Sequence, residues 1–232
     1  SLSIGPFTNQ DIEGDIFTLE NEVLEVKISS EGGNVISAKL KNYMTYDSLP
    51  LYLVHDNAKI NLALGGQGDY NSNQLTFTAS RKEKNELILE ASGTNGEVLN
   101  YTYRLNPDSY MLDWQMSTSG LGSYIGDKPV LNWEMETSRF EKNLETEKVQ
   151  TNLQYRIKNE EDVDEINGES EETETIDGTD WVAFKQQFFS TIIWNKQGTF
   201  GTSKFYLNGV NDDEHTKMMA SHLELHKVGD NL

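Results

Sequence analysis

The chain has 232 residues, no cysteine and a formal net charge of −19. This charge argues against a nucleic-acid partner, because such binding relies on Lys and Arg to neutralise phosphates, and the lack of cysteine excludes a disulfide framework and a thiolate metal site. No apolar run approaches the ~20 residues that span a membrane. Because the sequence lacks a signal-peptide pattern and does not begin with Met, we expect a soluble fragment of a longer protein.

Residues 1–14 contain Gly5, Pro6 and Gly14 and are expected to form a loose lead-in. From residue 15 onward, apolar and polar residues alternate repeatedly, which predicts antiparallel strands with one buried face. We therefore expect a single all-β domain over 15–232. The apolar residues of this pattern are Leu24, Val26, Ile28, Ile36, Ala38, Leu40, Ile60, Leu62, Leu64, Leu75, Phe77, Ala79, Leu87, Leu89, Ala91, Leu99, Tyr101, Tyr103, Leu105, Leu112, Trp114, Met116, Leu131, Trp133 and Met135.

Turn residues separate these runs. Gly32-Gly33 lies between two of them, and Asn95-Gly96 predicts a hairpin between 87–92 and 98–105. Helix is scarce, and 140–149 is the one stretch for which we expect a short helix.

Residues 158–180 are rich in Asp and Glu and poor in apolar side chains. Like charges repel, and little apolar area offsets the entropy cost of ordering the backbone. We expect a solvated acidic loop or hairpin excursion within the domain, mobile and dispensable for folding.

The stretch from Asp180 to Trp194 is the most apolar part of the chain, interrupted by Lys185-Gln186-Gln187. Residues 188–194 are apolar at both odd and even positions. A strand that is apolar on both faces is usually covered on both faces, so we expect Phe188–Trp194 to be a central, buried strand.

The candidates for chemistry are weak. His55, His215, His222 and His226 are the four histidines, and the last three, with Asp212 or Asp213, allow a zinc site but fit surface histidines better. Asp162-Val-Asp164 begins like a calcium loop, but Ile166 and the late Gly168 break the pattern. Gly65-Gly66-Gln67-Gly68 lacks the Lys-Ser/Thr of a phosphate loop. We expect no cofactor, no metal and no catalytic residue.

Most of the aromatic side chains in regular strands are expected to pack in the core. Trp114 and Trp133 stand on apolar faces of predicted strands, and Tyr101 and Tyr103 share one face of another strand. If a cleft exists, the tyrosines in less regular surroundings are better placed to line it. These are Tyr43, Tyr46, Tyr52, Tyr70 and Tyr124.

Two motifs together resemble the large periplasmic domain of YidC-type membrane protein insertases. The first has a Gly-Gly turn followed by Val-Ile-x-x-x-Leu-Lys-x-Tyr, and the second is Trp-Val-Ala, two residues, then Gln-Phe-Phe. The positions that carry the resemblance are Gly32, Gly33, Val35, Ile36, Leu40, Lys41, Tyr43, Trp181, Val182, Ala183, Gln187, Phe188 and Phe189.

The resemblance implies a twisted antiparallel β-super-sandwich, similar to galactose mutarotase, on the periplasmic side of a bacterial inner membrane. It implies an accessory domain, without catalysis, that contacts Sec translocon components (SecDF and SecYEG) or nascent membrane proteins. The acidic stretch 158–180 departs from the family. The alternative is a carbohydrate-binding or sugar-active domain. His55 would be the histidine of its His/carboxylate pair, but it lies in a loop-like stretch, which argues against this role.

Overall fold

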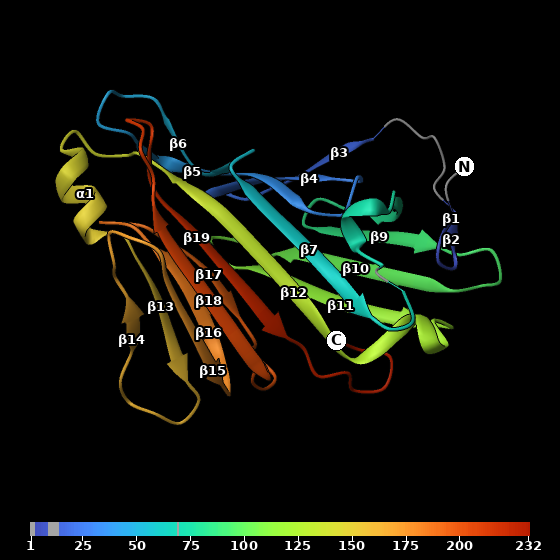
Figure 1. Cartoon of the computed structure of the whole chain (residues 1–232). Helices are drawn as coiled ribbons and strands as arrows, with labels where there is room; N and C mark the ends of the chain where they lie inside the picture. The colour runs from blue at the N-terminus through green and yellow to red at the C-terminus, as the bar shows by residue number, and fades with distance from the viewer. Residues whose placement is uncertain (1–2, 9–13, 69) are drawn as a thin grey trace.

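The computed structural model describes residues 3–8, 14–68 and 70–232, and its regular structure is almost entirely antiparallel β-strand (Figure 1). Sheet I has the strand order β3-β4-β5-β6, and sheet II the order β11-β10-β9-β8. The strands of sheet I are β3 (Ile16–Glu20), β4 (Leu24–Ser29), β5 (Val35–Met44) and β6 (Pro50–His55). The strands of sheet II are β8 (Thr78–Lys82), β9 (Glu86–Ser92), β10 (Val98–Leu105) and β11 (Leu112–Ser119).

Sheet III has the order β15-β18-β19-β12-β7, and sheet IV the order β14-β13-β16-β17. The strands of sheet III are β7 (Ala58–Gly65), β12 (Ile125–Ser138), β15 (Glu172–Asp177), β18 (Thr202–Gly209) and β19 (His215–Glu224). The strands of sheet IV are β13 (Asn152–Ile157), β14 (Asp164–Ile166), β16 (Thr179–Lys185) and β17 (Ser190–Trp194). In the described part of the chain, the helical elements are α1 (Leu144–Gln150) and two 3-10 turns, Ser72–Gln74 and Gly122–Tyr124.

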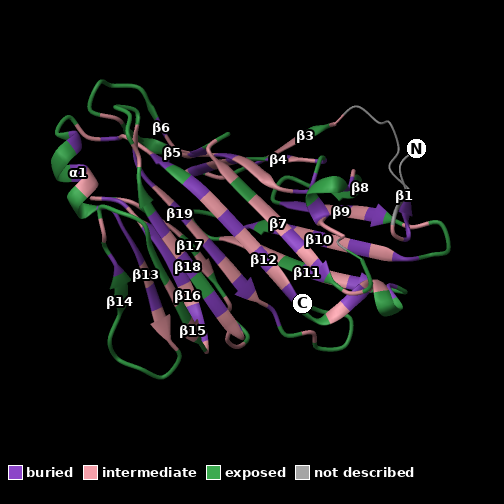
Figure 2. Ribbon diagram, in the orientation of Figure 1, coloured by how far each residue is buried: buried purple, intermediate pink, exposed green. Residues whose placement is uncertain are grey.

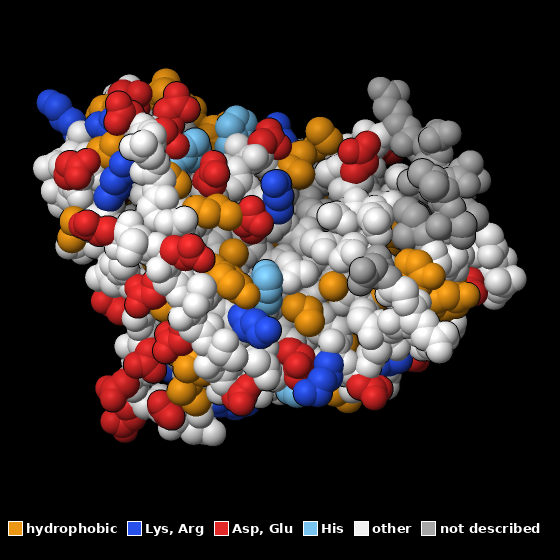
Figure 3. Space-filling model, in the orientation of Figure 1, with side chains coloured by type: hydrophobic (Ala, Val, Ile, Leu, Met, Phe, Trp, Pro, Cys, Tyr) orange, Lys and Arg blue, Asp and Glu red, His pale blue; other side chains and the backbone are white. Residues whose placement is uncertain are grey.

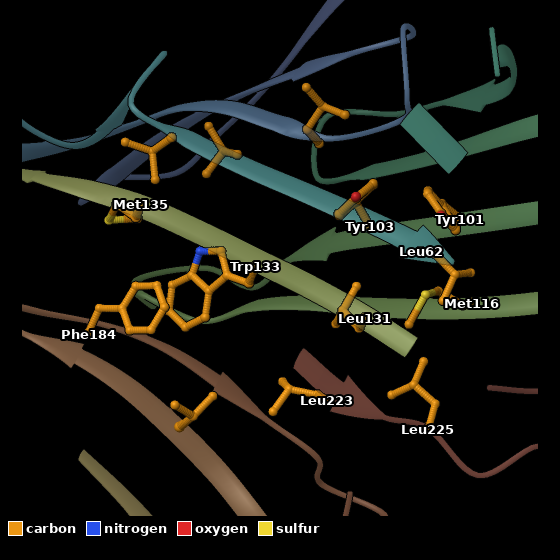
Figure 4. Close-up of a cluster of buried hydrophobic side chains, with 14 of the residues drawn as sticks. Leu62, Tyr101, Tyr103, Met116, Leu131, Trp133, Met135, Phe184, Leu223 and Leu225 are labelled. Carbon is orange, nitrogen blue, oxygen red and sulfur yellow. The ribbon is translucent and has the colours of Figure 1, made fainter. Parts of the chain in front are cut away.

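Aromatic stacking joins sheet III to sheet IV. The Trp133 ring of β12 lies on the Phe184 ring of β16, with centroids 3.7 Å apart (Figure 4). Tyr155 of β13 stacks on Phe205 of β18 at 4.8 Å. Buried and less buried residues alternate along β10 and β12, as the sequence pattern predicts (Figure 2). The predicted all-β sandwich is therefore confirmed.

The Gly32-Gly33 turn joins sheet I to sheet II. Both glycines turn the chain between β4 and β5 with positive φ, and the Tyr103 hydroxyl donates to the Gly33 carbonyl at 2.7 Å. The Asn95-Gly96 hairpin between β9 and β10 also forms as predicted, with φ +90° at Gly96. Glycine supplies the left-handed backbone that such turns need.

The predicted helix forms as α1. Its packing explains why the polar residues Lys185-Gln186-Gln187 interrupt the apolar stretch 180–194. Buried Glu147 accepts hydrogen bonds from the backbone N–H groups of Phe140 and Glu141, and burial raises its pKa. Gln186, also buried, donates to the Ser138 carbonyl at 2.6 Å. These polar side chains thus satisfy backbone groups under the helix, which a buried site requires.

The expected lead-in is only partly described, since residues 1–2 and 9–13 lie outside the described residues. Residues 3–8 differ from a loose segment, because β1 (Ser3–Ile4) pairs with β2 (Phe7–Thr8). The Phe7 side chain is 2% exposed and belongs to the hydrophobic core.

The prediction that Phe188–Trp194 is a central, buried strand is wrong. Strand β17 lies at the edge of sheet IV, and within the described ranges it pairs only with β16. Phe188, Ile192 and Trp194 are 68%, 55% and 47% exposed, whereas Ile193 packs against the core. The inner face of the strand, with Ile193, is directed toward the core, and the outer face is apolar but open.

The acidic segment 158–180, expected as a solvated loop or hairpin excursion, contains two strands, so the loop form is wrong for part of its length. That the segment is mobile and dispensable for folding stays a prediction. Strand β14 pairs with β13 at one edge of sheet IV, and β15 pairs with β18 at one edge of sheet III. Ile166 is 2% exposed and Ile176 packs against the core. The carboxylates point away from this core and gather over the β14–β15 end of the molecule (Figure 3).

We predict that Ile166→Ala lowers the free energy of unfolding by about 2–4 kcal/mol, because it removes a buried side chain and leaves a cavity. Val163 is the matched control: it is 48% exposed, so Val163→Ala is expected to change stability by about 0.5 kcal/mol or less. Urea melts measure both variants. Equal, small losses would mean that the acidic segment contributes nothing to the core.

Candidate functional site

A cleft of about 1040 Å³ is lined by the two edge strands β11 and β17. Sheets I and III supply apolar lining, including Val26, Leu40, Ile60, Leu131 and Trp133. Residues from 225 to 232 also line it. Apolar side chains from all four sheets therefore line one hollow.

The two sequence motifs, more than a hundred residues apart, come together at this cleft. Tyr43, at the end of the first motif, meets Phe189 of the second edge to face, with ring centroids 5.2 Å apart. Phe189 also contacts the Phe140 ring at 5.9 Å. Tyr43, Phe188 and Phe189 all line the cleft. The contact fastens β5 to the turn before β17.

The other motif residues support the strands beneath. Leu40 is buried and lines the cleft, Val182 and Ala183 are buried in β16, and Gln187 is half-buried. Half-buried Trp181 pairs across the sheet with Trp194. Gly32 and Gly33 lie away from the cleft, in the turn described above.

An ion pair spans the cleft between its two edge strands. Lys196, just after β17, pairs with Asp113 of β11, and its ammonium group lies 5.7 Å from the Trp194 ring centroid. Asn106 also donates to Asp113, at 3.2 Å. The hydrogen bond and the charge of Lys196 lower the pKa of Asp113, so this carboxylate stays ionised at neutral pH.

Of the five tyrosines expected near a cleft, only Tyr43 lines it, and Tyr46, Tyr52, Tyr70 and Tyr124 lie outside its lining. Sequence reasoning missed Tyr110 and Met111, which are 49% and 45% exposed and do line it. Burial and the neighbouring Tyr43 raise the pKa of Tyr110. The available signal was an apolar pair that follows the Asn106-Pro107-Asp108 turn after one further residue, Ser109.

The histidines are dispersed. His55 lies against Tyr52 at 4.7 Å, His215 contacts Asp212 at 3.1 Å, and His222 lies 5.0 Å from Tyr206. Only His226 lines the cleft.

Across residues 3–8, 14–68 and 70–232, no three His, Asp or Glu side chains gather as a metal site would require. The suggested calcium loop at 162–168 instead includes β14. In the same described ranges, no helix has the length and apolarity to cross a membrane.

Comparison with known proteins agrees with the two motifs. The model of the family described as YidC periplasmic domain matches residues 16–226. The membrane protein insertase YidC of Parabacteroides distasonis is 29% identical over 197 residues, and that of Phocaeicola vulgatus is 31% identical over 196 residues. These matches cover 82% and 80% of this chain, but only 31% and 30% of the two relatives.

The fold has a solved counterpart. A galactose mutarotase-like protein from Lactobacillus casei superposes with a TM-score of 0.53 at 11% identity, covering 90% of this chain and 87% of that one. At this identity the likeness concerns the fold alone, and it confirms the predicted mutarotase-like sandwich. With a family match over most of its length, the chain belongs to the YidC periplasmic domains, the periplasmic part of a bacterial inner-membrane protein.

Proposed function

We propose that this chain is an accessory domain of a membrane protein insertase and that its cleft receives apolar segments of emerging membrane proteins. The observation that carries the proposal is the apolar, partly open cleft beside exposed Phe188, Ile192 and Trp194. Exposed apolar surface of this kind marks interaction sites.

The relatives support the class of occupant. They are named membrane protein insertases, so their substrates by name are membrane proteins, and membrane-spanning segments are long apolar stretches. A Sec translocon component is the competing occupant, and the same experiment separates the two.

The proposal assigns no catalysis to the chain. Asp113, a carboxylate at the cleft, is held in an ion pair with Lys196 and is not free to act as a base. The mutarotase-like fold alone does not carry sugar chemistry. His55 lies outside the cleft lining and is paired with Tyr52, so nothing favours the carbohydrate alternative.

The test is site-specific photo-crosslinking in the full-length protein during membrane-protein synthesis. A photoreactive phenylalanine derivative at position 192 is expected to crosslink to the newly made protein. The matched control is position 16, because Ile16 is 59% exposed and Ile192 is 55% exposed, but Ile16 lies outside the cleft. Crosslinks from position 192 exclusively to Sec components would identify them as the occupant instead.

We further predict that Ile192→Asp weakens binding of an apolar peptide at least about tenfold, because the aspartate would be desolvated on binding. Ile16→Asp is expected to leave binding unchanged. Both side chains are exposed, so neither variant is expected to alter stability by more than about 0.5 kcal/mol. Isothermal titration measures binding, and equal effects at the two sites would contradict a role for the cleft.

A further inference from the structure

Among the residues that the structure describes, no other strand occupies one backbone edge of β17. The Phe189 carbonyl accepts from the Gln186 N–H at 2.7 Å, and the Asn195 N–H donates to the Asp180 carbonyl at 2.8 Å. Odd-numbered residues here therefore direct their backbone groups toward β16. Because alternate residues of a strand point opposite ways, the even-numbered residues of β17 direct theirs away from β16, toward the open edge.

The edge of β11 already accepts backbone pairing at one end. The Thr118 N–H donates to the Asp230 carbonyl at 2.7 Å, and the Leu232 N–H donates to the Met116 carbonyl at 3.2 Å. Residues 230–232 thus form one antiparallel bridge to β11, between Ser117 and Asn231. In the described part of the chain, the first half of β11, residues 112–115, has no neighbour on this side.

The two free edges belong to one cleft. Residues 112–115 and all of β17 line it, and the Lys196–Asp113 ion pair joins the two edges. Neighbouring strands lie about 4.8 Å apart, so one inserted strand needs edges roughly 10 Å apart. Lys196 reaches Asp113 from the turn that follows β17, so this ion pair bounds the space between the two edges at one end.

We propose that the cleft binds its occupant by strand addition. An extended polypeptide segment pairs with the open edge of β17, and its alternate side chains point into the apolar lining. The occupant is therefore a chain in the β conformation with apolar residues at every second position, rather than a preformed helix. This inference rests on the proposed function and specifies how the cleft recognises a segment.

Several features of the molecule favour this mode over contact through side chains alone. Main-chain hydrogen bonds give affinity without requiring a particular sequence, and the pockets for alternate side chains select apolar residues. Ile192 and Trp194 are exposed on the outer face of β17, where side chains of an added strand would pack beside them. The Ser117–Asn231 bridge shows, for one residue pair, that the edge of β11 accepts such backbone pairing.

The first experiment uses a short peptide in which Val alternates with Thr between terminal Lys residues, titrated into the full chain. Two N-methylated versions are compared with it, each blocking the N–H groups along one edge of the peptide. We expect one version to lose at least about tenfold in affinity, because two or three backbone hydrogen bonds disappear. Protection of the Ile192 amide from hydrogen exchange on binding is the direct readout.

Two protein variants form the second arm. Ile192→Pro removes the outward N–H while keeping an apolar side chain, and proline is tolerated where an edge N–H faces solvent. Ile192→Val keeps the N–H and controls for side-chain size. We expect the proline variant to lose binding about tenfold and the valine variant to keep it.

Binding that is unaffected by N-methylation, with no protection of the Ile192 amide, would overturn strand addition. The proposed function would survive that result, because the peptide would still occupy the cleft. A peptide that does not bind at all would also overturn strand addition, and crosslinking from position 192 would then decide the proposed function separately. The peptide measurements on the parent chain remain decisive if Ile192→Pro fails to fold.

Discussion

Replacing Trp133 with alanine is expected to lower the free energy of unfolding by about 3–5 kcal/mol. The Trp133 side chain is 2% exposed and stacks on Phe184 across the interface between sheets III and IV. Its removal leaves a cavity where two strands on different sheets meet. For a chain of this size, the loss corresponds to a melting point lower by about 6–20 °C.

Trp194→Ala is the matched control. Trp194 is 47% exposed on the outer face of β17, so its removal is expected to cost about 1 kcal/mol or less. Thermal and urea melts of both variants measure the difference. A Trp194→Ala loss as large as that of Trp133→Ala would show that β17 is buried in solution, as its sequence suggests.

The second large effect is expected at Gly33. A Cβ atom there would lie 2.7 Å from the Tyr101 ring and 3.1 Å from Phe77, and the backbone φ is +67°. A left-handed conformation costs a non-glycine residue about 1–2 kcal/mol, and overpacking adds about 1–3 kcal/mol. Gly33→Ala is therefore expected to destabilise the protein by about 2–5 kcal/mol in urea melts.

The variant Gly96→Ala separates the conformational cost from the overpacking cost. Its φ is +90°, but a Cβ atom would meet nothing within 4 Å, so Gly96→Ala is expected to cost only the conformational part, about 1–2 kcal/mol. If both alanine variants lose the same amount, the Tyr101 ring moves aside freely and the junction between sheets I and II is not tightly packed.

Period-two alternation predicts most of this fold, because each half-buried strand carries its own pattern. Strands β4, β10 and β12 bury the residues that alternation selects. The same reasoning fails at β17, because alternation reports how apolar a face is and not what covers it. Ile192 and Trp194 are as apolar as core residues, yet no element of the described chain lies over them.

The loop predicted for the acidic segment 158–180 misses its two strands for the opposite reason. In Glu172-Thr-Glu-Thr-Ile-Asp177 the period of two is present, but polar residues carry it, so net charge outweighed the strand signal. An edge strand needs only a few buried contacts, and here Ile166 and Ile176 supply them.

The cleft could not be predicted from the sequence, for a third reason. Its lining runs from Leu24 to Leu232 and depends on how four sheets meet. The motifs pointed to Tyr43 and Phe189 individually, and local patterns do not encode their contact.

The open edge of β17 also bears on how copies of the chain behave toward one another. An unpaired apolar strand edge is a template for pairing with another molecule, and natural edge strands usually carry a lysine or a proline against it. Strand β17 has neither. The net charge of −19 protects the edge instead, because two copies of the chain repel each other before their edges meet. Colloidal stability is thereby tied to ionic strength and to carboxylate ionisation: salt shortens the repulsion to a Debye length of about 8 Å or less, and acid near pH 4 removes it.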